Sequence, residues 1–171
     1  MAYTAPRTWT AGEYPTAAQF NQDLRDNVSF LANPPACKVT DTGGQSVADD
    51  TDTLLLWDTE EFDTDTMHST SVNPGRITFT RAGLYVVTAN VIFPTNGNGY
   101  RHARIRANGT TTLAEDARTS ASVVTNIGHS LSVLYKAAAA QYAEVLCRQT
   151  TTAALTTTAD SNFSAVWIGL G

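Results

Sequence analysis

The stretch RITFTRAGLYVVTANVIF, residues 76–93, decides the fold class. In its first part, apolar Ile77 and Phe79 alternate with threonines, which is the period-two pattern of a half-buried strand. Gly83 supplies the backbone freedom that a tight reversal needs, so a longer strand is predicted to follow it. One face of this longer strand is apolar throughout and consists of Tyr85, Val87, Ala89, Val91 and Phe93.

The opposite face of the longer strand is also poorly suited to water, since it carries Leu84, Val86, Thr88, Asn90 and Ile92. A strand that needs cover on both sides either lies centrally in a sandwich or presses against another subunit. The last predicted strand, residues 162–170, is apolar on both faces as well. We therefore expect core and subunit interface to be built from Leu84, Tyr85, Val86, Val91, Phe163, Trp167 and Ile168.

From Cys37 onward the whole chain has the pattern of strands and turns. Beyond those already described, short strands are predicted at residues 37–40, 53–58, 100–107, 111–117, 123–135 and 141–149. In the strand at 100–107, Ala103 and Ile105 point inward and Arg104 and Arg106 outward. Eight or more short strands with regular turns predict an all-β, antiparallel sandwich or jelly roll.

One helix is predicted, from Thr16 to Leu31. Thr16 is its N-cap, and Gln19 completes a capping box. A narrow apolar stripe follows the helix through Phe20, Leu24, Val28 and Leu31. About fifteen residues are marginal for an isolated helix in water, so the stripe must be buried, either against its own domain or in a short bundle with copies of itself. The stiff Asn33-Pro34-Pro35 spacer favours the bundle.

An extended arm precedes the helix, and residues 2–14 show no periodicity. A frayed terminus has the same pattern, but Trp9 and Tyr14 favour an arm that docks on a partner. The expected organisation is an anchor arm with a trimerising neck helix in residues 1–35 and a head domain in residues 36–171.

Composition excludes several classes of protein. The 171 residues carry a net charge of −5, which argues against general binding of nucleic acid. No run approaches the length of a membrane span, and the first residues lack the apolar core of a signal peptide, so we expect no membrane insertion. Cys37 and Cys147 have no metal-like spacing, and free buried thiols are favoured over a disulfide.

Nine of the sixteen acidic residues lie between Asp41 and Asp65. Within this segment, Asp49, Asp50 and Asp52 have the oxygen ligands of a calcium site but lack the loop signature of a dedicated one, so a solvated acidic loop is favoured. A transition-metal site at Asp63, Asp65 and His68 is disfavoured because it has a single histidine. We predict no metal and no cofactor.

No catalytic motif is present: the chain lacks a Gly-x-Ser-x-Gly elbow, a phosphate-cradling loop and a dinucleotide fingerprint. A row of arginines comprises Arg101, Arg104, Arg106 and Arg118. The row is a weak candidate for binding an acidic ligand or a neighbour's acidic segment, and an ordinary charged outer face is the favoured interpretation. We expect a protein that is not an enzyme.

The order of landmarks in residues 37–171 resembles the complement globular-head and tumour-necrosis-factor-like superfamily. The resemblance rests on Ala82-Gly83-Leu84-Tyr85, Ala107-Asn108-Gly109, Tyr142-Ala143-Glu144-Val145 and Asn162-Phe163-Ser164-Ala165. The chain departs from the family at residues 137–141, where members usually carry a Gly-Asp turn. The resemblance implies a jelly roll of about ten strands that assembles as a homotrimer.

The N-terminal segment, residues 3–31, is similar to the start of many tailed-bacteriophage virion proteins. The similarity rests on Trp9-Thr10-Ala11-Gly12-Glu13, Thr16-Ala17-Ala18-Gln19-Phe20-Asn21 and Leu24-Arg25-Asp26-Asn27. Together the two resemblances imply a trimeric virion appendage, made in the bacterial cytoplasm, whose arm binds other virion proteins.

Three assignments stay open. The first is a tail-fibre or tail-tip component whose head attaches to a host cell-surface glycan or protein. The second is a capsid decoration protein or head fibre held on the shell by its N-terminal arm. The third is a bacterial sugar-binding module, since jelly-roll loops carry many different ligands on one scaffold.

Overall fold

The computed structural model describes residues 3–119 and 125–171. The chain divides into two compact units, Met1–Pro34 and Pro35–Gly171, and the division falls within the Asn33-Pro34-Pro35 spacer. Among the described residues, no helix combines the length and the apolar character needed to cross a membrane.

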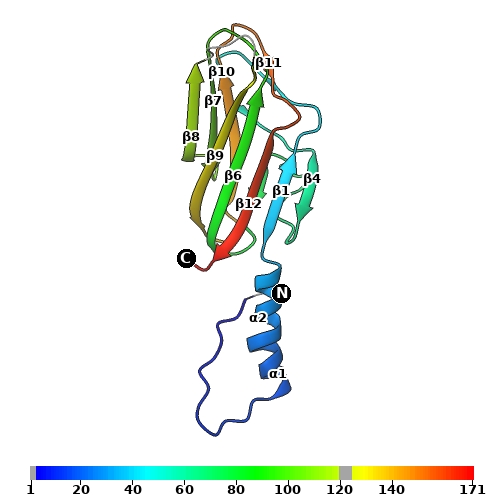
Figure 1. The fold of residues 1–171 in the computed structure, drawn as a ribbon, viewed down its shortest axis with the longest axis vertical. Helices are drawn as coiled ribbons and strands as arrows, with labels where there is room; N and C mark the ends of the chain where they lie inside the picture. Colours follow the sequence, from blue (N-terminus) through cyan, green and yellow to red (C-terminus); the bar gives the residue numbers. More distant parts are fainter. Residues whose placement is uncertain (1–2, 120–124) are drawn as a thin grey trace. The chain divides into compact units, whose positions relative to one another are not determined.

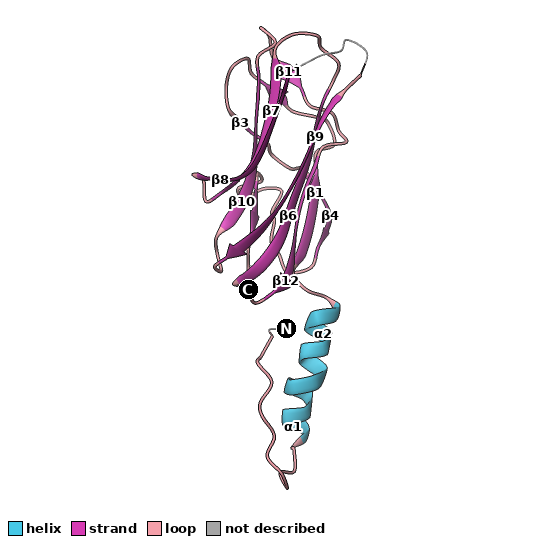
Figure 2. Ribbon diagram, turned by 60° about the vertical axis from the view of Figure 1, so that its left-hand side comes forward, coloured by secondary structure: helices cyan, strands magenta, loops and turns pink. Residues whose placement is uncertain are grey.

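The first unit consists of the arm and one continuous helical rod, shown in cyan in Figure 2. The rod is built from α1 (Ala17–Phe20), the π-helical η1 (Asn21–Asp26) and α2 (Asn27–Ala32). The predicted capping box is confirmed: the Thr16 hydroxyl accepts the Gln19 backbone N–H at 3.3 Å, and the Gln19 side chain accepts the Thr16 N–H at 2.7 Å. Two of the free N–H groups at the helix start are thereby satisfied.

The second unit is built from antiparallel strands around one core (Figure 1). Its strands are β1 (Ala36–Thr40), β2 (Ser46–Val47), β3 (Thr53–Leu54), β4 (Thr59–Asp63), β5 (Arg76–Thr78), β6 (Gly83–Phe93), β7 (Tyr100–Ala107), β8 (Thr111–Thr119), β9 (Ile127–Ala137), β10 (Tyr142–Gln149), β11 (Leu155–Thr156) and β12 (Asn162–Gly169).

Two five-stranded sheets form the layers of the sandwich. The first has the order β4-β1-β12-β6-β9, and the second has the order β3-β10-β7-β8 with β5 also paired to β10. Strands β2 and β11 form a small separate pair. The predicted all-β antiparallel jelly roll is confirmed. The strand singled out by the sequence, β6, is an inner strand of the first sheet, paired with β12 and β9, and its core-facing residues from Gly83 to Phe93 are all buried.

Several elements differ from the prediction. The strand predicted at residues 53–58 is reduced to β3, Thr53–Leu54, and the short strands β2 and β11 were not predicted. Strand β4 was not predicted, because its sequence TEEFD lacks an apolar alternation, and it forms through edge pairing with β1. Strand β9 begins at Ile127, whereas the prediction began it at residue 123; residues 123 and 124 lie outside the described part of the chain. In place of a family-like Gly-Asp turn, Ala140 takes a φ of 68° and donates its N–H to Phe79.

Candidate assembly interface

The apolar stripe of the helical rod is open to solvent within its own unit. The exposed fractions are 47% for Phe20, 55% for Leu24, 63% for Val28 and 60% for Leu31. Trp9 of the arm lies beside the stripe, with its ring centroid 6.2 Å from that of Phe20. Four large apolar side chains in a row on an exposed surface have the character of a contact surface.

The arm covers the other side of the rod, and sequence reasoning missed this contact. Asn27 clamps Thr4 in both directions, accepting its N–H at 3.0 Å and donating to its carbonyl at 2.8 Å. Arg7 pairs with the buried Asp23 at 3.0 Å. Tyr3 packs against the buried Phe30, with ring centroids 6.2 Å apart.

The covered face of the rod has a recognisable spacing in hindsight. Asp23, Asn27 and Phe30 stand four and three residues apart, which places them on one side of a helix. Because two of the three are polar, the pattern is hidden from a search for apolar periodicity. The partner of this face is the chain's own arm.

The two proposed anchor residues differ in their surroundings. Trp9 is 40% exposed and lies against Phe20, with the Arg7 guanidinium 5.2 Å from its ring centre. Tyr14 is 92% exposed. The arm thus docks on its own helix, and its attachment to a second virion protein stays a prediction that concerns Tyr14 above all.

The predicted interface strands divide into core and surface positions. Tyr85, Val91, Phe163 and Trp167 are buried between the sheets, at 0%, 0%, 0% and 5% exposure. The outward-facing positions lie on the open face of the first sheet: Leu84 and Val86 are half-buried, and Ile168 is 49% exposed.

Further apolar side chains lie next to these outward positions. Val86 lies opposite Leu134 of β9 on one side and Val166 of β12 on the other, and Leu134 is 61% exposed. Leu170, just beyond β12, is 58% exposed. We call the set the sheet patch; it comprises Leu84, Val86, Leu134, Val166, Ile168 and Leu170.

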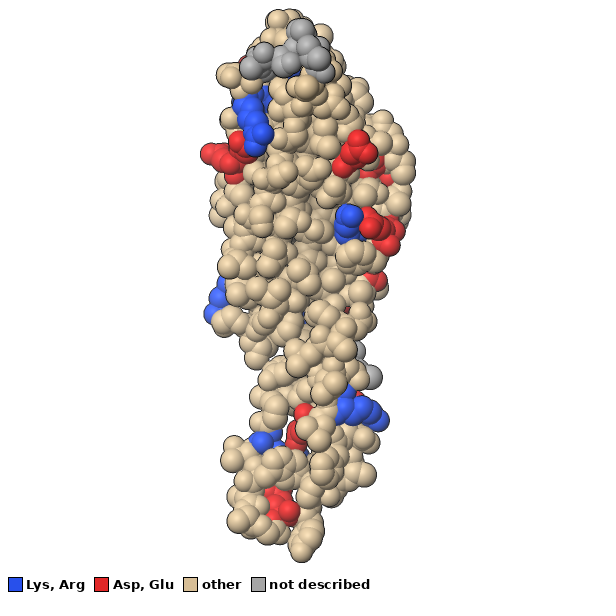
Figure 3. Space-filling model, viewed as in Figure 1, with Lys and Arg blue, Asp and Glu red and all other residues tan. Residues whose placement is uncertain are grey.

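The middle of the same sheet face is polar but carries no charge. The Thr88 hydroxyl lies 2.6 Å from the Ser164 hydroxyl, and further along the strands Ser130 donates to Asn90 at 3.2 Å. Figure 3 shows this face over β6 and β12 as a broad tan surface, with charged side chains gathered at its borders. Depletion of charge together with exposed aliphatic groups is the composition of an interface core.

Carboxylates considered for calcium have partners in the chain. Asp50 accepts two hydrogen bonds from Arg148, the shorter at 2.7 Å, and Asp52 pairs with Arg104. Asp49 accepts the Thr152 N–H at 2.8 Å. Within the described residues, no group of three or more His, Cys, Asp or Glu side chains is arranged to hold a metal ion.

The second candidate metal site is a hydrogen-bonded turn. Asp63 accepts the backbone N–H groups of Asp65 and His68, at 3.1 and 2.8 Å. The His68 ring is engaged at both nitrogens, with Glu60 and with the Pro74 carbonyl, each at 3.0 Å. These contacts connect β4 to the loop that follows it.

The prediction of one outward arginine row is wrong at Arg101. Its side chain is fully buried and donates to the carbonyls of Asn98 at 2.7 Å and Asn96 at 2.9 Å. Burial lowers the pKa of this guanidinium. Arg106 pairs instead with the buried Glu144, at 2.6 Å. The row is thus divided among separate contacts within the chain, including the Arg104 and Asp52 pair.

Both cysteines are free and buried, as predicted. Burial raises the pKa of the Cys37 thiol to about 12 and also raises that of Cys147. A thiol that stays protonated is a poor nucleophile, so both act as small apolar core residues.

The chain matches known proteins at the level of three-dimensional structure. No family model and no curated protein sequence matches the chain. Among solved structures, the globular domain of zebrafish complement 1qA aligns with a TM-score of 0.60 at 9% identity, over 78% of this chain and 97% of that one. Murine APRIL at pH 5.0 aligns with a TM-score of 0.62 at 10% identity, over 78% and 98%. The structure of murine APRIL at pH 8.0 gives 0.61 at 11% identity, over the same shares.

The head has the C1q/TNF-like jelly-roll fold. At 9–11% identity this likeness concerns the fold alone. The similarity of the N-terminal segment to phage virion proteins, the homotrimer and the absence of enzymatic activity stay predictions.

Proposed function

We propose that this chain is a structural virion protein of a tailed bacteriophage or phage-like particle. In this proposal it forms a homotrimeric appendage, with residues 1–35 as anchor and neck and residues 36–171 as the head, and the head attaches to the host surface. A tail fibre or tail tip is the proposed location. The phage-like N-terminal segment and the C1q/TNF-like head support the proposal together.

The single observation that carries the trimer is the presence of two uncovered apolar surfaces on one chain. These are the helix stripe and the sheet patch, ten side chains in all, with Leu24, Val28, Leu134 and Leu170 each more than half exposed. Burying one such side chain contributes about 1.5–3 kcal/mol relative to full exposure. Summed over three chains, this exceeds the cost of bringing them together, which is about 4–15 kcal/mol for each association.

Trimerisation also gives the attachment its strength. Three heads on one axis present three copies of any binding surface, so the second and third contacts form at a high effective concentration. A weak contact per head then holds a particle firmly. A binding role of this kind needs no catalytic residues, and the sequence contains no catalytic motif.

The alternative location is the capsid, where the protein would be a decoration protein or head fibre. The 92% exposed Tyr14 in the arm fits either location, because an aromatic side chain in an anchor segment fits a pocket on a neighbouring protein. The two locations differ in copy number, since tail appendages are few and shell proteins number in the hundreds.

Two measurements test the proposal. Sedimentation equilibrium of the purified chain at micromolar concentration should give three times the 18.3 kDa chain mass, and a stable single chain contradicts the trimer. Immunogold labelling of the particle should place the protein at the tail. Labels spread over the shell support the capsid alternative, and particles that lack the protein contradict a virion role altogether.

A further inference from the structure

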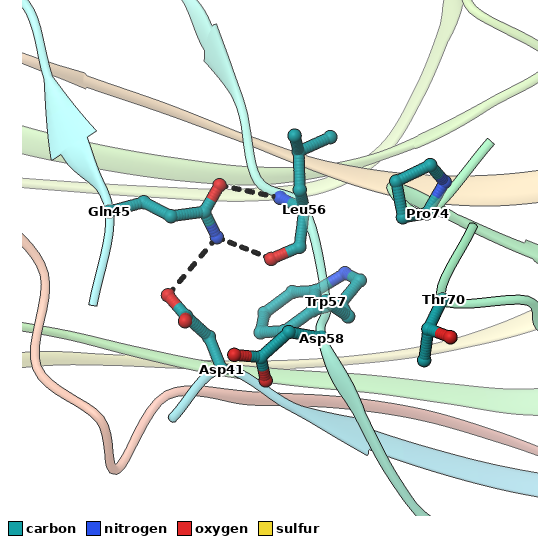
Figure 4. Close-up of a pocket in the computed structure, with 7 residues that line it drawn as sticks. All are labelled: Asp41, Gln45, Leu56, Trp57, Asp58, Thr70 and Pro74. Atoms are coloured by element: carbon teal, nitrogen blue, oxygen red, sulfur yellow. Dashed lines mark hydrogen bonds between the residues drawn. The ribbon is translucent and has the colours of Figure 1, made fainter. Parts of the chain in front are cut away.

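A hollow with a volume of about 300 Å³ lies at the β4 side of the head, and neither sheet patch nor helix stripe contributes to it. Figure 4 shows its lining residues converging from three segments: Asp41 and Gln45, then residues 56–58, then Thr70 and Pro74. The volume lies at the lower end of the range for small-molecule sites.

The wall of the hollow is fixed by one glutamine. The Gln45 side chain accepts the Leu56 N–H at 2.7 Å and donates to the Leu56 carbonyl, and its amide nitrogen also donates to Asp41 at 3.2 Å (Figure 4). All of its donors are therefore in use. A site held by such contacts is largely formed before any ligand binds.

The charge of the hollow is uncompensated. Three carboxylates of the acidic segment have basic partners: Asp52 pairs with Arg104, Glu61 with Lys38 and Asp65 with Arg81. In the described part of the chain, no ion pair reaches Asp41 or Asp58.

Both carboxylates of the hollow accept hydrogen bonds from neighbouring residues. The Asp41 carboxylate, which is 6% exposed, accepts the Gly43 N–H at 3.1 Å. Asp58 accepts the hydroxyl and the N–H of Thr42, at 2.5 and 3.1 Å, and the hydroxyl bond lowers its pKa. Each of the two carboxylates has a lone pair left for a further donor.

Besides the two carboxylates, the lining includes the polar Gln45 and Thr70, and its other residues are apolar. Leu56 is 47% exposed, Pro74 forms the opposite side, and the Trp57 ring lies between them and Asp58 in Figure 4. The Trp57 Nε1–H is buried without a hydrogen-bond partner among the described residues. The Trp57 ring is 1% exposed and stacks on Phe163, with ring centroids 5.9 Å apart, so Leu56 and Pro74 supply the accessible apolar surface. Such a surface beside two carboxylates fits a cation that carries a hydrocarbon stem.

We propose that this hollow binds a primary alkylammonium group, with the ammonium at Asp41 and Asp58 and the stem on Leu56 and Pro74. A hard metal ion fits less well, because it needs six or more oxygen ligands and no cluster of three or more acidic or histidine side chains is arranged for one among the described residues. A neutral ligand leaves both charges uncompensated. The proposal does not depend on the virion assignment.

The test uses the full chain labelled with ¹⁵N. Its spectrum has three indole N–H signals, one for each tryptophan, and a Trp57→Phe variant assigns the one of interest. We titrate n-pentylammonium chloride and follow this signal and the Gln45 side-chain amide. Both should move, with a dissociation constant on the order of 10 mM for a ligand of this size.

Matched probes and variants make the result specific. Asp58→Asn should weaken binding about two- to fivefold, whereas Asp52→Asn, in the same acidic segment but paired with Arg104, should leave it unchanged. Leu56→Ser should weaken it as well, and an otherwise unchanged spectrum of each variant shows that the fold is intact.

Three results overturn the proposal: no movement of either signal, equal movement with uncharged n-pentanol, or movement with CaCl₂ at lower concentration than with the amine. A second arm compares two natural sources of the amine, Nα-acetyl-lysine methylamide and glucosamine. Tighter binding of the first supports a protein receptor, and tighter binding of the second supports an aminated polysaccharide. Binding of N-acetylglucosamine in preference to glucosamine contradicts an ammonium site.

Discussion

Gly83 begins β6 with a φ of 150°, and a Cβ at this position would lie 2.1 Å from Nε1 of Trp167 and 2.5 Å from the Gly169 carbonyl oxygen. The glycine is thus required by the close approach of β12 as well as by its own backbone. We expect Gly83→Ala to lower the free energy of unfolding by more than about 2 kcal/mol, measured by urea denaturation at fixed chain concentration. Gly43→Ala is the control: nothing lies within 4 Å of its added Cβ, and its effect should stay within about 0.5 kcal/mol. Equal effects of the two variants contradict this account.

Arg101 shows where residue-scale prediction fails. Alternation correctly placed Ala103 and Ile105 inside, and the same alternation places Arg101 inside too. An outward position was expected because a charged arginine side chain is rarely buried. The side chain is accommodated because the turn before β7 offers the Asn96 and Asn98 carbonyls, and a turn's carbonyl directions are not visible in the sequence.

His129 predicts a pH dependence of stability. Its ring is fully buried, Nδ1 lies 3.0 Å from Asp116, and Nε2 has no partner among the described residues. Burial lowers the pKa of His129 below its ordinary 6.5, and the electrostatic interactions with Arg118 and His102 act in the same direction, against Asp116. As the pH falls through about 6.5, His129 therefore takes up a proton in the unfolded chain but not in the folded chain.

The sign follows from this difference in bound protons. Stability should fall as the pH drops below about 6.5, by up to about 1.4 kcal/mol per pH unit, until the folded pKa is reached. His129→Gln cannot take up this proton, so its unfolding free energy should vary less between pH 7 and pH 5. Parallel pH profiles for the two proteins contradict the assignment to His129.

At the scale of elements, the helix was the most predictable feature and the arm the least. The capping box and the apolar stripe are local patterns of spacing, which a sequence displays directly. The arm has no spacing of its own, because its contacts are set by the helix face on which it lies. The sheet patch is intermediate: β6 and β12 were predicted, whereas Leu134 became part of it only through the pairing of β9 with β6.

The arm's contact with the helix predicts a change in protection. Asn27→Ala removes both hydrogen bonds to Thr4, so the arm should detach more often and its amides should exchange with solvent severalfold faster. Hydrogen exchange read by mass spectrometry on the arm segment measures this. Asn21→Ala, at an exposed position of the same rod, should leave the arm's exchange unchanged. An arm that exchanges equally fast in the wild type, the control and Asn27→Ala is not held by Asn27.

At the scale of the whole molecule, each unit carries its own uncovered apolar surface. A trimer that uses both should lose stability at each independently, since the two surfaces belong to different compact units. Leu24→Ser tests the helix stripe and Leu134→Ser tests the sheet patch. Each should weaken association by about 1–2 kcal/mol per chain, because an aliphatic side chain loses its burial in the assembly.

The double variant decides between one interface and two. If both surfaces are buried in the trimer, Leu24→Ser with Leu134→Ser should weaken association by the sum of the single effects, and sedimentation equilibrium at micromolar concentration should then show single chains. Val72→Ser is the matched control, since Val72 is 67% exposed in a loop outside both surfaces, and it should sediment as the wild type does. If the double variant associates as strongly as Leu134→Ser alone, the heads alone drive assembly. The helix stripe must then be covered by a different protein, and the role of the neck is anchoring instead of self-association.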